Sequence, residues 1–358
     1  LKLLYSRMEE LNSNINTALY KKVTIVSIKE EIPGFKTFVL DGPVTYTAGQ
    51  YLTLVHLGKY EEIRRSYSFT SAPLLGEPMT IGVKRVENGF FSRMLIERAQ
   101  PGDSLLTIGA AGRFTLPANL EGIKQVFFLA AGSGITPVFS LLKTLLHQYP
   151  DVKATLVYSN ASPEKTLFLQ ELETLQQKYS QLQIEFLFSN SKFLSKARLY
   201  RDLLEKFVQD FIQVPFSQVL FYVCGPESYM RMCSYVLQEA QVPQAHIKKE
   251  NFVIQRVQPA RATPPDTATR QVQLTMGGQQ FQFNVQHPDT ILQGAKKAGI
   301  SLPYSCEVGR CGNCLARCTS GNIWHSYNEV LTDKELSQGL LLTCVAHPVG
   351  GDVKMVID

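Results

Sequence analysis

The most constraining feature of this 358-residue sequence is a group of cysteines near its C-terminal end. Cys306, Cys311 and Cys314 follow a C-x4-C-x2-C pattern, and Cys344 comes from a later segment. This spacing is one that binds a [2Fe–2S] cluster, because three thiolates in one loop cover one side of the cluster and a distant thiolate completes it. The pattern therefore predicts an iron–sulfur site formed by these four residues.

A zinc site and unpaired buried thiols are the alternatives. Zinc modules usually combine two C-x2-C pairs or add histidines, and here only Cys311 and Cys314 form such a pair. The total of 7 cysteines is odd and four of them crowd into residues 306–318, which disfavours a disulfide framework. We expect Cys318 to be a packed thiol. Together the cysteines favour a reducing compartment and predict a cytoplasmic protein.

Length and composition restrict the class of protein. At about 150 residues per domain the chain holds two or three domains. A composition of 44% hydrophobic and 19% charged residues excludes collagen-like, disordered and coiled-coil proteins. The 36 Lys and Arg against 31 Asp and Glu form no basic block, so no nucleic-acid partner is predicted. No membrane span is predicted either, because glycines and Pro137 interrupt the most apolar stretch, residues 126–146.

Changes of pattern along the chain predict three domains after an N-terminal extension of residues 1–20. Residues 21–120 show short alternating strands between Gly, Pro and Asp turns, which is typical of an antiparallel β-barrel. Residues 121–255 alternate apolar strands with amphipathic helices, which predicts an α/β domain with a parallel sheet covered on both faces. Residues 256–271 have the composition of a linker. Residues 272–358 form the third domain and open with a hairpin pattern.

The segment R-S-Y-S-F-T-S, from Arg65 to Ser71, lies between two predicted barrel strands. Such a strand offers a flavin one cation for phosphate, the aromatic face of Tyr67 for the ring, and hydroxyl or backbone donors for N5 and O4. Exposed strands with Arg, Tyr and Ser are common, so this segment alone is a weak indication.

A glycine turn at Gly89 opens a short predicted helix that carries Ser92 near its N-terminus. That end of a helix offers free N–H groups and a favourable dipole to a pyrophosphate. The alternative role of Ser92 is a simple helix cap.

Two further motifs follow predicted strands of the α/β domain. G-S-G-I-T-P at residues 132–137 opens a helix, and its glycines permit close approach of a phosphate, although the third glycine of G-x-G-x-x-G is missing. C-G-P at residues 224–226 lies at the carboxyl edge of the sheet, where nucleotides bind in open α/β folds. The alternative for Cys224 is a buried strand cysteine.

In this order, the segments at 65–71, 89–95, 132–137 and 224–226 resemble the ferredoxin–NADP reductase superfamily. The cysteine loop that begins at Pro303 resembles plant-type ferredoxin, which implies an α+β β-grasp domain. The fused order resembles the reductase components of bacterial multicomponent oxygenases, among them phenylacetyl-CoA epoxidase reductases and ketosteroid hydroxylase reductases. The resemblance covers about residues 20–358.

The resemblance implies three cofactors: FAD, a [2Fe–2S] cluster, and NADPH or NADH. The residues it places at FAD are Arg65 and Ser92 on the pyrophosphate, Tyr67 stacked on the ring, Ser68 at N5, and Ser71 and Gly89 beside them. The residues it places at the nicotinamide cofactor are Gly132, Gly134 and Thr136 on the phosphates, with Cys224, Gly225 and Pro226 near the nicotinamide. Ser68 and Cys224 are the catalytic residues that it implies.

The implied activity is that of an NAD(P)H-dependent electron-transfer flavoprotein. Hydride from NAD(P)H reduces FAD, and single electrons pass through the cluster to a separate acceptor, an oxygenase or hydroxylase component. The alternatives are a reductase for a non-oxygenase metalloprotein and a catalytically silent binding or scaffold protein. The choice between NADPH and NADH stays open. Ser159-Asn160 stand where some NADPH-using relatives have an arginine, whereas Arg198, Arg201 or Lys192 could meet a 2′-phosphate.

Overall fold

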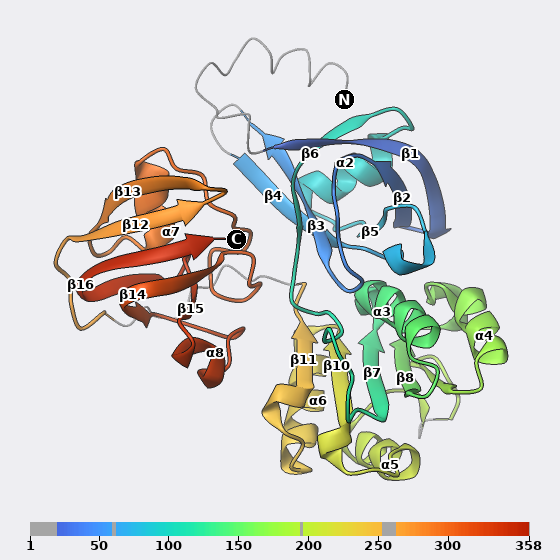
Figure 1. The fold of residues 1–358 in the computed structure, drawn as a ribbon. Coiled ribbons are helices and arrows are strands. Elements are labelled where there is room, and N and C mark those ends of the chain that lie inside the picture. Colours follow the sequence, from blue (N-terminus) through green and yellow to red (C-terminus); the bar gives the residue numbers. More distant parts are fainter. Residues whose placement is uncertain (1–19, 59–61, 194–195, 253–262, 358) are drawn as a thin grey trace. The chain divides into compact units, whose positions relative to one another are not determined.

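The structure is a computed structural model that describes residues 20–58, 62–193, 196–252 and 263–357. The chain divides into two compact units, residues 1–252 and 253–358, and each unit has its own hydrophobic core (Figure 1). The predicted extension, apart from Tyr20, and residues 256–262 of the predicted linker lie outside the described residues.

The first unit contains a barrel and a parallel sheet with helices. The barrel elements are β1 (Lys21–Ile32), β2 (Phe35–Asp41), β3 (Tyr51–Leu57), β4 (Glu62–Ser68), β5 (Thr80–Lys84), α2 (Phe90–Arg98) and β6 (Ser104–Ala111). The sheet elements are β7 (Gln125–Ala131), α3 (Ile135–Gln148), β8 (Lys153–Asn160), α4 (Leu169–Lys178), β9 (Leu182–Phe188), α5 (Arg201–Phe211), β10 (Val219–Cys224), α6 (Glu227–Glu239) and β11 (Ile247–Glu250). Short 3-10 turns include η3 (Gly132–Gly134) and η4 (Pro163–Lys165).

The barrel is a six-stranded antiparallel sheet in the order β4-β3-β6-β1-β2-β5. A bridge between Phe69 and Ile81 joins the segment after β4 to β5, so the two edges of the sheet meet. Alternate residues along β6 are buried, as expected for strands with one face in a core. Helix α2 contributes Phe91 and Leu95 to that core.

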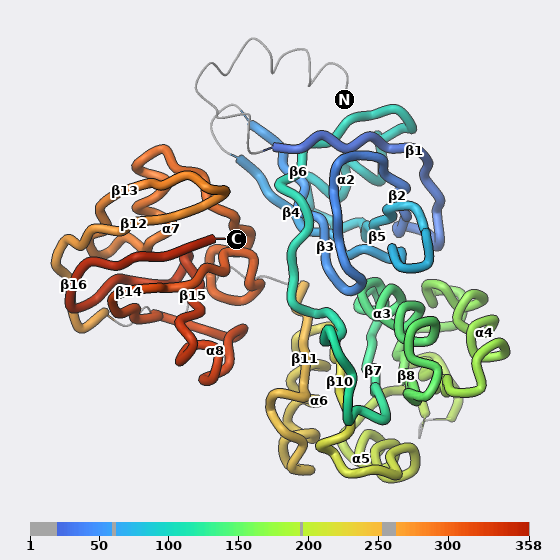
Figure 2. The backbone as a smooth tube through the Cα atoms, in the orientation of Figure 1, coloured from blue at the N-terminus to red at the C-terminus, as the bar shows by residue number. Residues whose placement is uncertain are grey.

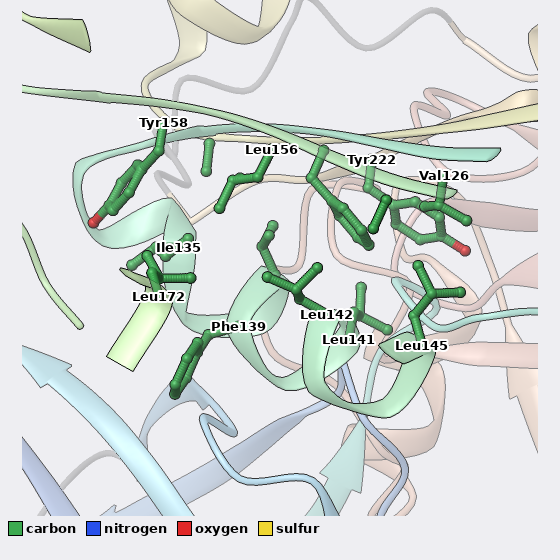
Figure 3. Packing of buried hydrophobic residues seen from close by; sticks show 14 of the residues in the cluster. Val126, Ile135, Phe139, Leu141, Leu142, Leu145, Leu156, Tyr158, Leu172 and Tyr222 are labelled. Carbon is green, nitrogen blue, oxygen red and sulfur yellow. The ribbon is translucent and has the colours of Figure 1, made fainter. Parts of the chain in front are cut away.

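The parallel sheet has the order β11-β10-β7-β8-β9. Every residue of β7 and β10 is buried, because helices cover both faces of the sheet. Helix α3 lies on one face and packs Leu141, Leu142 and Leu145 against the strands (Figure 3). Helices α5 and α6 contribute to the separate core on the other face. The chain runs outward from β7 to β9 and then returns to β10, so a topological switch point lies between β7 and β10.

Buried hydrogen bonds join the barrel to the parallel sheet inside the first unit. The Ser140 hydroxyl on α3 donates to the Ser71 carbonyl at 2.6 Å. The Tyr222 hydroxyl on β10 donates to the Thr115 carbonyl at 2.8 Å. Because both bonds are short and partly or fully buried, the first fixes the segment after β4 to helix α3 and the second fixes the segment after β6 to β10.

The second unit is a mixed five-stranded sheet in the order β13-β12-β16-β14-β15. Its elements are β12 (Arg270–Met276), β13 (Gln279–Val285), α7 (Ile291–Lys297), β14 (Leu315–His325), α8 (Asp333–Ser337), β15 (Leu340–Leu342) and β16 (Ala346–Ile357) (Figure 2). Strands β12 and β16 are parallel, whereas the other pairs are antiparallel. β12 begins at Arg270, so the last two residues of the predicted linker belong to a strand.

The predicted fold class is confirmed: an antiparallel barrel, a parallel α/β sheet and a C-terminal α+β domain occur in one chain. Within the part of the chain that the structure describes, no helix is long and apolar enough to cross a membrane.

Candidate flavin, nicotinamide and cluster sites

Strand β4 presents Arg65 and Tyr67 on the side of helix α2. The Tyr67 ring lies 6.3 Å from the Phe91 ring on α2, measured between ring centroids. Burial raises the pKa of the Tyr67 hydroxyl above its ordinary value, so this side chain stays neutral. The Arg65 side chain is exposed and donates to the Arg64 carbonyl at 2.7 Å. A cation and an aromatic face therefore stand two residues apart on one strand, beside a helix.

The two serines at the end of this strand differ in their surroundings. Ser68 is buried as the last residue of β4. The Ser71 hydroxyl lies 2.6 Å from the Tyr46 hydroxyl and accepts from the Thr80 amide at 2.9 Å. Its carbonyl accepts the Ser140 bond described above. Ser71 therefore ties the barrel to helix α3 through its own hydrogen bonds.

Ser92 lies in the first turn of α2 and does not cap the helix, because the N-cap residue is Gly89 and no side chain caps that end. The Ser92 hydroxyl accepts from the Val86 amide at 3.1 Å and lies 3.4 Å from the Gly89 carbonyl. A Cβ at Gly89 would come within 2.6 Å of that hydroxyl, which explains the glycine. The first amides of a helix have no partner within the helix, so this turn offers N–H groups, and its Phe91 ring lies beside Tyr67 of β4.

The two glycines after β7 have different structural reasons. Gly132 has φ +53° and an added Cβ there would meet nothing within 4 Å, so its surface is open. Gly134 is closely packed, because a Cβ would lie 2.2 Å from the Cys224 carbonyl oxygen at the end of β10. Gly134 thus allows the ends of β7 and β10 to approach each other at the switch point.

Thr136, in the first turn of α3, is buried, and its hydroxyl donates to the Ser133 carbonyl at 3.0 Å. Its methyl group lies 2.8 Å from the position that a Cβ on Gly82 would occupy. Thr136 therefore packs against barrel strand β5 and closes the Ser133 turn.

Cys224 is fully buried at the carboxyl end of β10, with Ala130 on one side and Glu250 on the other in the sheet register. Burial raises the pKa of the Cys224 thiol well above its ordinary value, and the nearby Glu250 carboxyl adds to the effect. Burial also raises the pKa of Glu250 to about 8. Both groups are therefore held in their neutral forms near neutral pH.

A cavity of about 1030 Å³ opens at this carboxyl edge of the parallel sheet. Its walls include Gly132 and Ser133 from the turn after β7, Ser159 and Asn160 from the end of β8, and Pro226 after β10. This is the location where nucleotides bind in open α/β sheets. Gly132, Ser133 and Pro226 of the predicted segments therefore meet at one cavity, whereas the predicted residues Gly134, Thr136, Cys224 and Gly225 are not part of its wall.

Arg198 and Arg201, two of the three residues that the sequence offers for a 2′-phosphate, line this cavity, whereas Lys192 does not and Lys84 and Lys165 were not predicted. Lys84, Lys165 and Arg198 line it, and none of them has an acidic partner among the described residues. Arg201 also lines the cavity but pairs with Glu205 at 2.8 Å. Lys84 comes from the barrel and Arg198 from the segment before α5, so no short motif contains this set.

The three cysteines of the C-x4-C-x2-C pattern converge with Cys344 in the second unit. The sulfurs of Cys314 and Cys344 lie 3.2 Å apart. Hydrogen bonds from the Cys311 and Cys344 thiols and from two loop amides lower the pKa of Cys306 below its ordinary value. In the described residues no three or more His, Cys, Asp or Glu side chains are spaced around a single metal ion. Hydrogen bonds instead link Cys306 to Cys311 and Cys344, and Cys314 to Cys344, and four such thiols are the donor set that binds [2Fe–2S].

Two further observations fit a cluster at these thiols. The amides of Val308 and Arg310 both donate to the Cys306 sulfur at 3.4 Å. The buried hydroxyl of Thr343, next to Cys344, has no hydrogen-bond partner within the described ranges. Buried hydroxyls rarely lack partners, so an additional acceptor at this position fits the residues present. Cys318 lies apart on β14, where its thiol donates to the Ser320 carbonyl.

Comparison with known proteins identifies the family. The chain matches the oxidoreductase FAD-binding domain over residues 19–116, the oxidoreductase NAD-binding domain over 128–235 and the 2Fe-2S iron-sulfur cluster binding domain over 274–349. A component of the 1,2-phenylacetyl-CoA epoxidase of Escherichia coli K12 is 30% identical over 331 residues, which cover 90% of this chain and 92% of that protein. The chain belongs to the ferredoxin–NADP reductase superfamily, with a fused [2Fe–2S] domain.

Other relatives agree with this assignment. The ferredoxin reductase component of 3-ketosteroid-9-alpha-monooxygenase from Rhodococcus rhodochrous is 28% identical, over 93% of this chain and 95% of that protein. The solved structure of phthalate dioxygenase reductase has the same fold, with a TM-score of 0.57 and 24% identity over 94% of this chain and 98% of that chain. The 358-residue chain is therefore an NAD(P)H oxidoreductase that uses FAD and a [2Fe–2S] cluster. The predicted family, enzyme class and cofactors are confirmed.

Proposed function

We propose that this reductase delivers electrons from NAD(P)H to a separate oxygenase or hydroxylase component in the cytoplasm. The observation that carries the proposal is the presence, in one chain, of a dinucleotide-sized cavity, a flavin strand and four converging thiols. The names of its relatives support the acceptor class, because they refer to an epoxidase and a monooxygenase. The predicted alternative, a reductase for a non-oxygenase metalloprotein, differs only in the acceptor.

In this proposal the barrel orients the flavin. Arg65 and the free amides of α2 hold the pyrophosphate, because a guanidinium and a helix N-terminus both favour phosphate oxygens. Gly89 and Ser92 keep that turn in shape. Tyr67 provides the aromatic face for the ring, and Ser68 offers a hydroxyl at N5. Ser71 acts from behind by joining this strand to α3.

The α/β sheet positions the nicotinamide cofactor in the same proposal. Gly132 leaves room for a phosphate in the cavity, Gly134 brings the two strand ends together, and Thr136 keeps the turn closed against the barrel. Pro226 continues the wall after β10, and Gly225 lets the chain pass close to Ala131 and Tyr229. Cys224 contributes a neutral thiol that excludes water beside the nicotinamide, since burial disfavours its thiolate.

The cations at the cavity favour NADPH over NADH as the donor. No acidic side chain stands at the end of β8, where enzymes specific for NADH often bind the ribose 2′-hydroxyl. Arg198 and Lys165 instead offer positive charge without an acidic partner among the described residues, which suits an additional phosphate. Of the described residues in the cavity wall, Glu164 alone is acidic.

The four cysteines Cys306, Cys311, Cys314 and Cys344 are the proposed cluster ligands. When bound, FAD supplies the change from two-electron to one-electron transfer, and the cluster carries single electrons onward. The loop amides stabilise the thiolate of Cys306, and Thr343 offers a further hydroxyl donor. The protein thereby places the two redox groups and tunes them.

Anaerobic titration of the purified chain with NADPH and NADH tests the function. We expect the flavin absorbance to bleach first and the iron–sulfur absorbance to follow, with NADPH the better reductant. A purified oxygenase component should then be reduced by the loaded protein. A protein without a flavin band, or one whose iron–sulfur band does not respond to NAD(P)H, would contradict the proposal.

A further inference from the structure

We infer that Lys296 is a positioning residue for the cluster, because it holds Glu307 in the backbone conformation that directs loop amides at the Cys306 sulfur. The inference rests on the proposed ligand set. It concerns a residue of α7 that is ten positions from the first cysteine and belongs to no motif.

Glu307 has an unusual backbone conformation directly after the first ligand. Its φ of +60° lies in the left-handed region, which Gly adopts readily and a residue with a Cβ adopts at a cost. Only two other non-glycine residues of the described chain, Phe168 and Gln241, share a positive φ. Such a conformation persists where the surroundings enforce it, so the contacts of Glu307 are informative.

Lys296 makes those contacts. Its ammonium lies 2.9 Å from a carboxylate oxygen of Glu307 and 3.7 Å from the centroid of the Tyr304 ring. One side chain therefore contacts the loop on both sides of Cys306, through an ion pair and a cation–π contact. Lys296 itself stands in the last turn of α7, where the helix dipole favours a cation.

The conformation of Glu307 determines where the following amides point. The amides of Val308 and Arg310 each lie 3.4 Å from the Cys306 sulfur. Amide donors to a ligating sulfur stabilise the thiolate and raise the reduction potential of a cluster, since reduction adds negative charge. If Glu307 leaves the left-handed region, both amides are displaced together.

The part of the loop around Arg310 is held by contacts that do not involve Lys296. The Arg310 guanidinium lies 3.2 Å from Glu329 and 5.7 Å from the Tyr327 ring centroid. Loss of Lys296 should therefore displace the backbone around Cys306, while the backbone around Arg310 remains in place. This makes the expected defect local rather than a collapse of the loop.

The neighbouring residue provides a matched control. Lys297 has the same charge on the same helix end, but its ammonium pairs with Asp289 at 2.5 Å. No contact of Lys297 with the cluster loop is found among the described residues. Lys296→Met and Lys297→Met thus remove the same charge, but only Lys296→Met removes contacts with Glu307 and Tyr304 of the loop.

The experiment compares Lys296→Met, Lys297→Met, Glu307→Ala and Glu307→Gly in the full chain. The readouts are the rate at which the cluster absorbance is lost in the presence of a chelator and the cluster midpoint potential. We expect cluster loss to be about tenfold faster in Lys296→Met and Glu307→Ala, with a lower midpoint potential. Lys297→Met should remain within about twofold of the unsubstituted protein, because the loop keeps its clamp.

Glu307→Gly separates the backbone effect from the charge effect. Glycine adopts the left-handed conformation without a clamp, so we expect this variant to keep its cluster longer than Glu307→Ala. Equal rates for Lys296→Met and Lys297→Met would overturn the inference, and so would equal rates for the two Glu307 variants. If the unsubstituted protein assembles no cluster at all, the ligand set itself is wrong.

Discussion

The turn after β7 lines the candidate nucleotide cavity and the loop around Cys306 carries three of the four candidate cluster ligands, and these two segments are stabilised in opposite ways. At the turn, the ends of β7 and β10 pack so closely that a Cβ on Gly134 would have no room. In the loop, irregular backbone is held by side chains, such as Lys296 on Glu307 and Arg310 beside Glu329. Substitutions at the turn should therefore cost folding free energy, whereas substitutions around the loop should change the cofactor.

The largest expected effect comes from the loop. Cys306→Ser removes a proposed thiolate ligand, so we expect loss of the cluster and a fall of about 100-fold or more in reduction of the protein acceptor. Reduction of ferricyanide through the flavin should persist, because the flavin strand belongs to the other unit. Iron content, electron paramagnetic resonance and the two activities measure this. Parallel loss of flavin reduction would break the proposed separation between the regions.

Gly134→Ala is the corresponding test at the turn. The added Cβ meets backbone atoms of Cys224 that cannot rotate away, so we expect a loss of about 3 kcal/mol in the free energy of unfolding of the first unit. Gly132→Ala is the control, since its space is open and only its positive φ is strained, which costs about 1 kcal/mol. Urea unfolding followed by flavin fluorescence compares them. Equal losses would show that close packing is not the reason for Gly134.

The pH dependence of stability distinguishes the units. Burial, together with the charge of His347, lowers the pKa of His325 to about 4, and its Nε2 accepts from the Leu342 amide at 3.3 Å. The pKa of a histidine in the unfolded chain is about 6.5. Between pH 4 and pH 6.5 the unfolded state therefore binds more protons than the folded state. Stability is therefore complete above pH 6.5 and falls as the pH drops towards 4, by about 2 kcal/mol at pH 5.

Trp324, the single tryptophan, reports on this unit because it precedes His325 on β14. Urea unfolding followed by its fluorescence at pH 7.5 and pH 5 measures the effect. His325→Gln keeps an acceptor for the Leu342 amide and cannot be protonated, so most of the pH dependence should disappear. If this variant retains the full dependence, another group is responsible.

The smallest expected effect concerns the donor. Arg198→Ala should lower kcat/KM for NADPH by about tenfold, because one hydrogen bond to a charged group is lost. The kcat/KM for NADH should stay within about twofold of its original value. Lys192→Ala is the matched control, because Lys192 lies outside the cavity wall. Steady-state ferricyanide reduction with both donors gives the ratio. An equal loss with NADPH and NADH would mean that Arg198 does not contact a 2′-phosphate.

Much of the architecture could be predicted from local patterns. Alternating strands, buried apolar runs and the cysteine spacing are periodic or contiguous in sequence, so the fold class and the iron–sulfur site followed from them, whereas FAD and the nicotinamide cofactor followed from the resemblance. Thr136 shows the limit of this approach. The resemblance implies a phosphate contact for Thr136, which stays a prediction, and the structure adds that its methyl group packs against Gly82 of the barrel. A motif identifies which residues gather at a site, but the neighbours supplied by another element decide what each of them does.

The sequence by itself determined the order of the domains and the four candidate thiols from residue type and spacing, and the resemblance of its motifs to a known superfamily implied the three cofactors. Only the tertiary structure decided which cations reach the cavity, why Gly134 lacks a side chain, and that Lys296 contacts the loop around Cys306. Those features depend on distances between elements far apart in the sequence. Such distances follow from the packing of the sheets and helices, which no local pattern encodes.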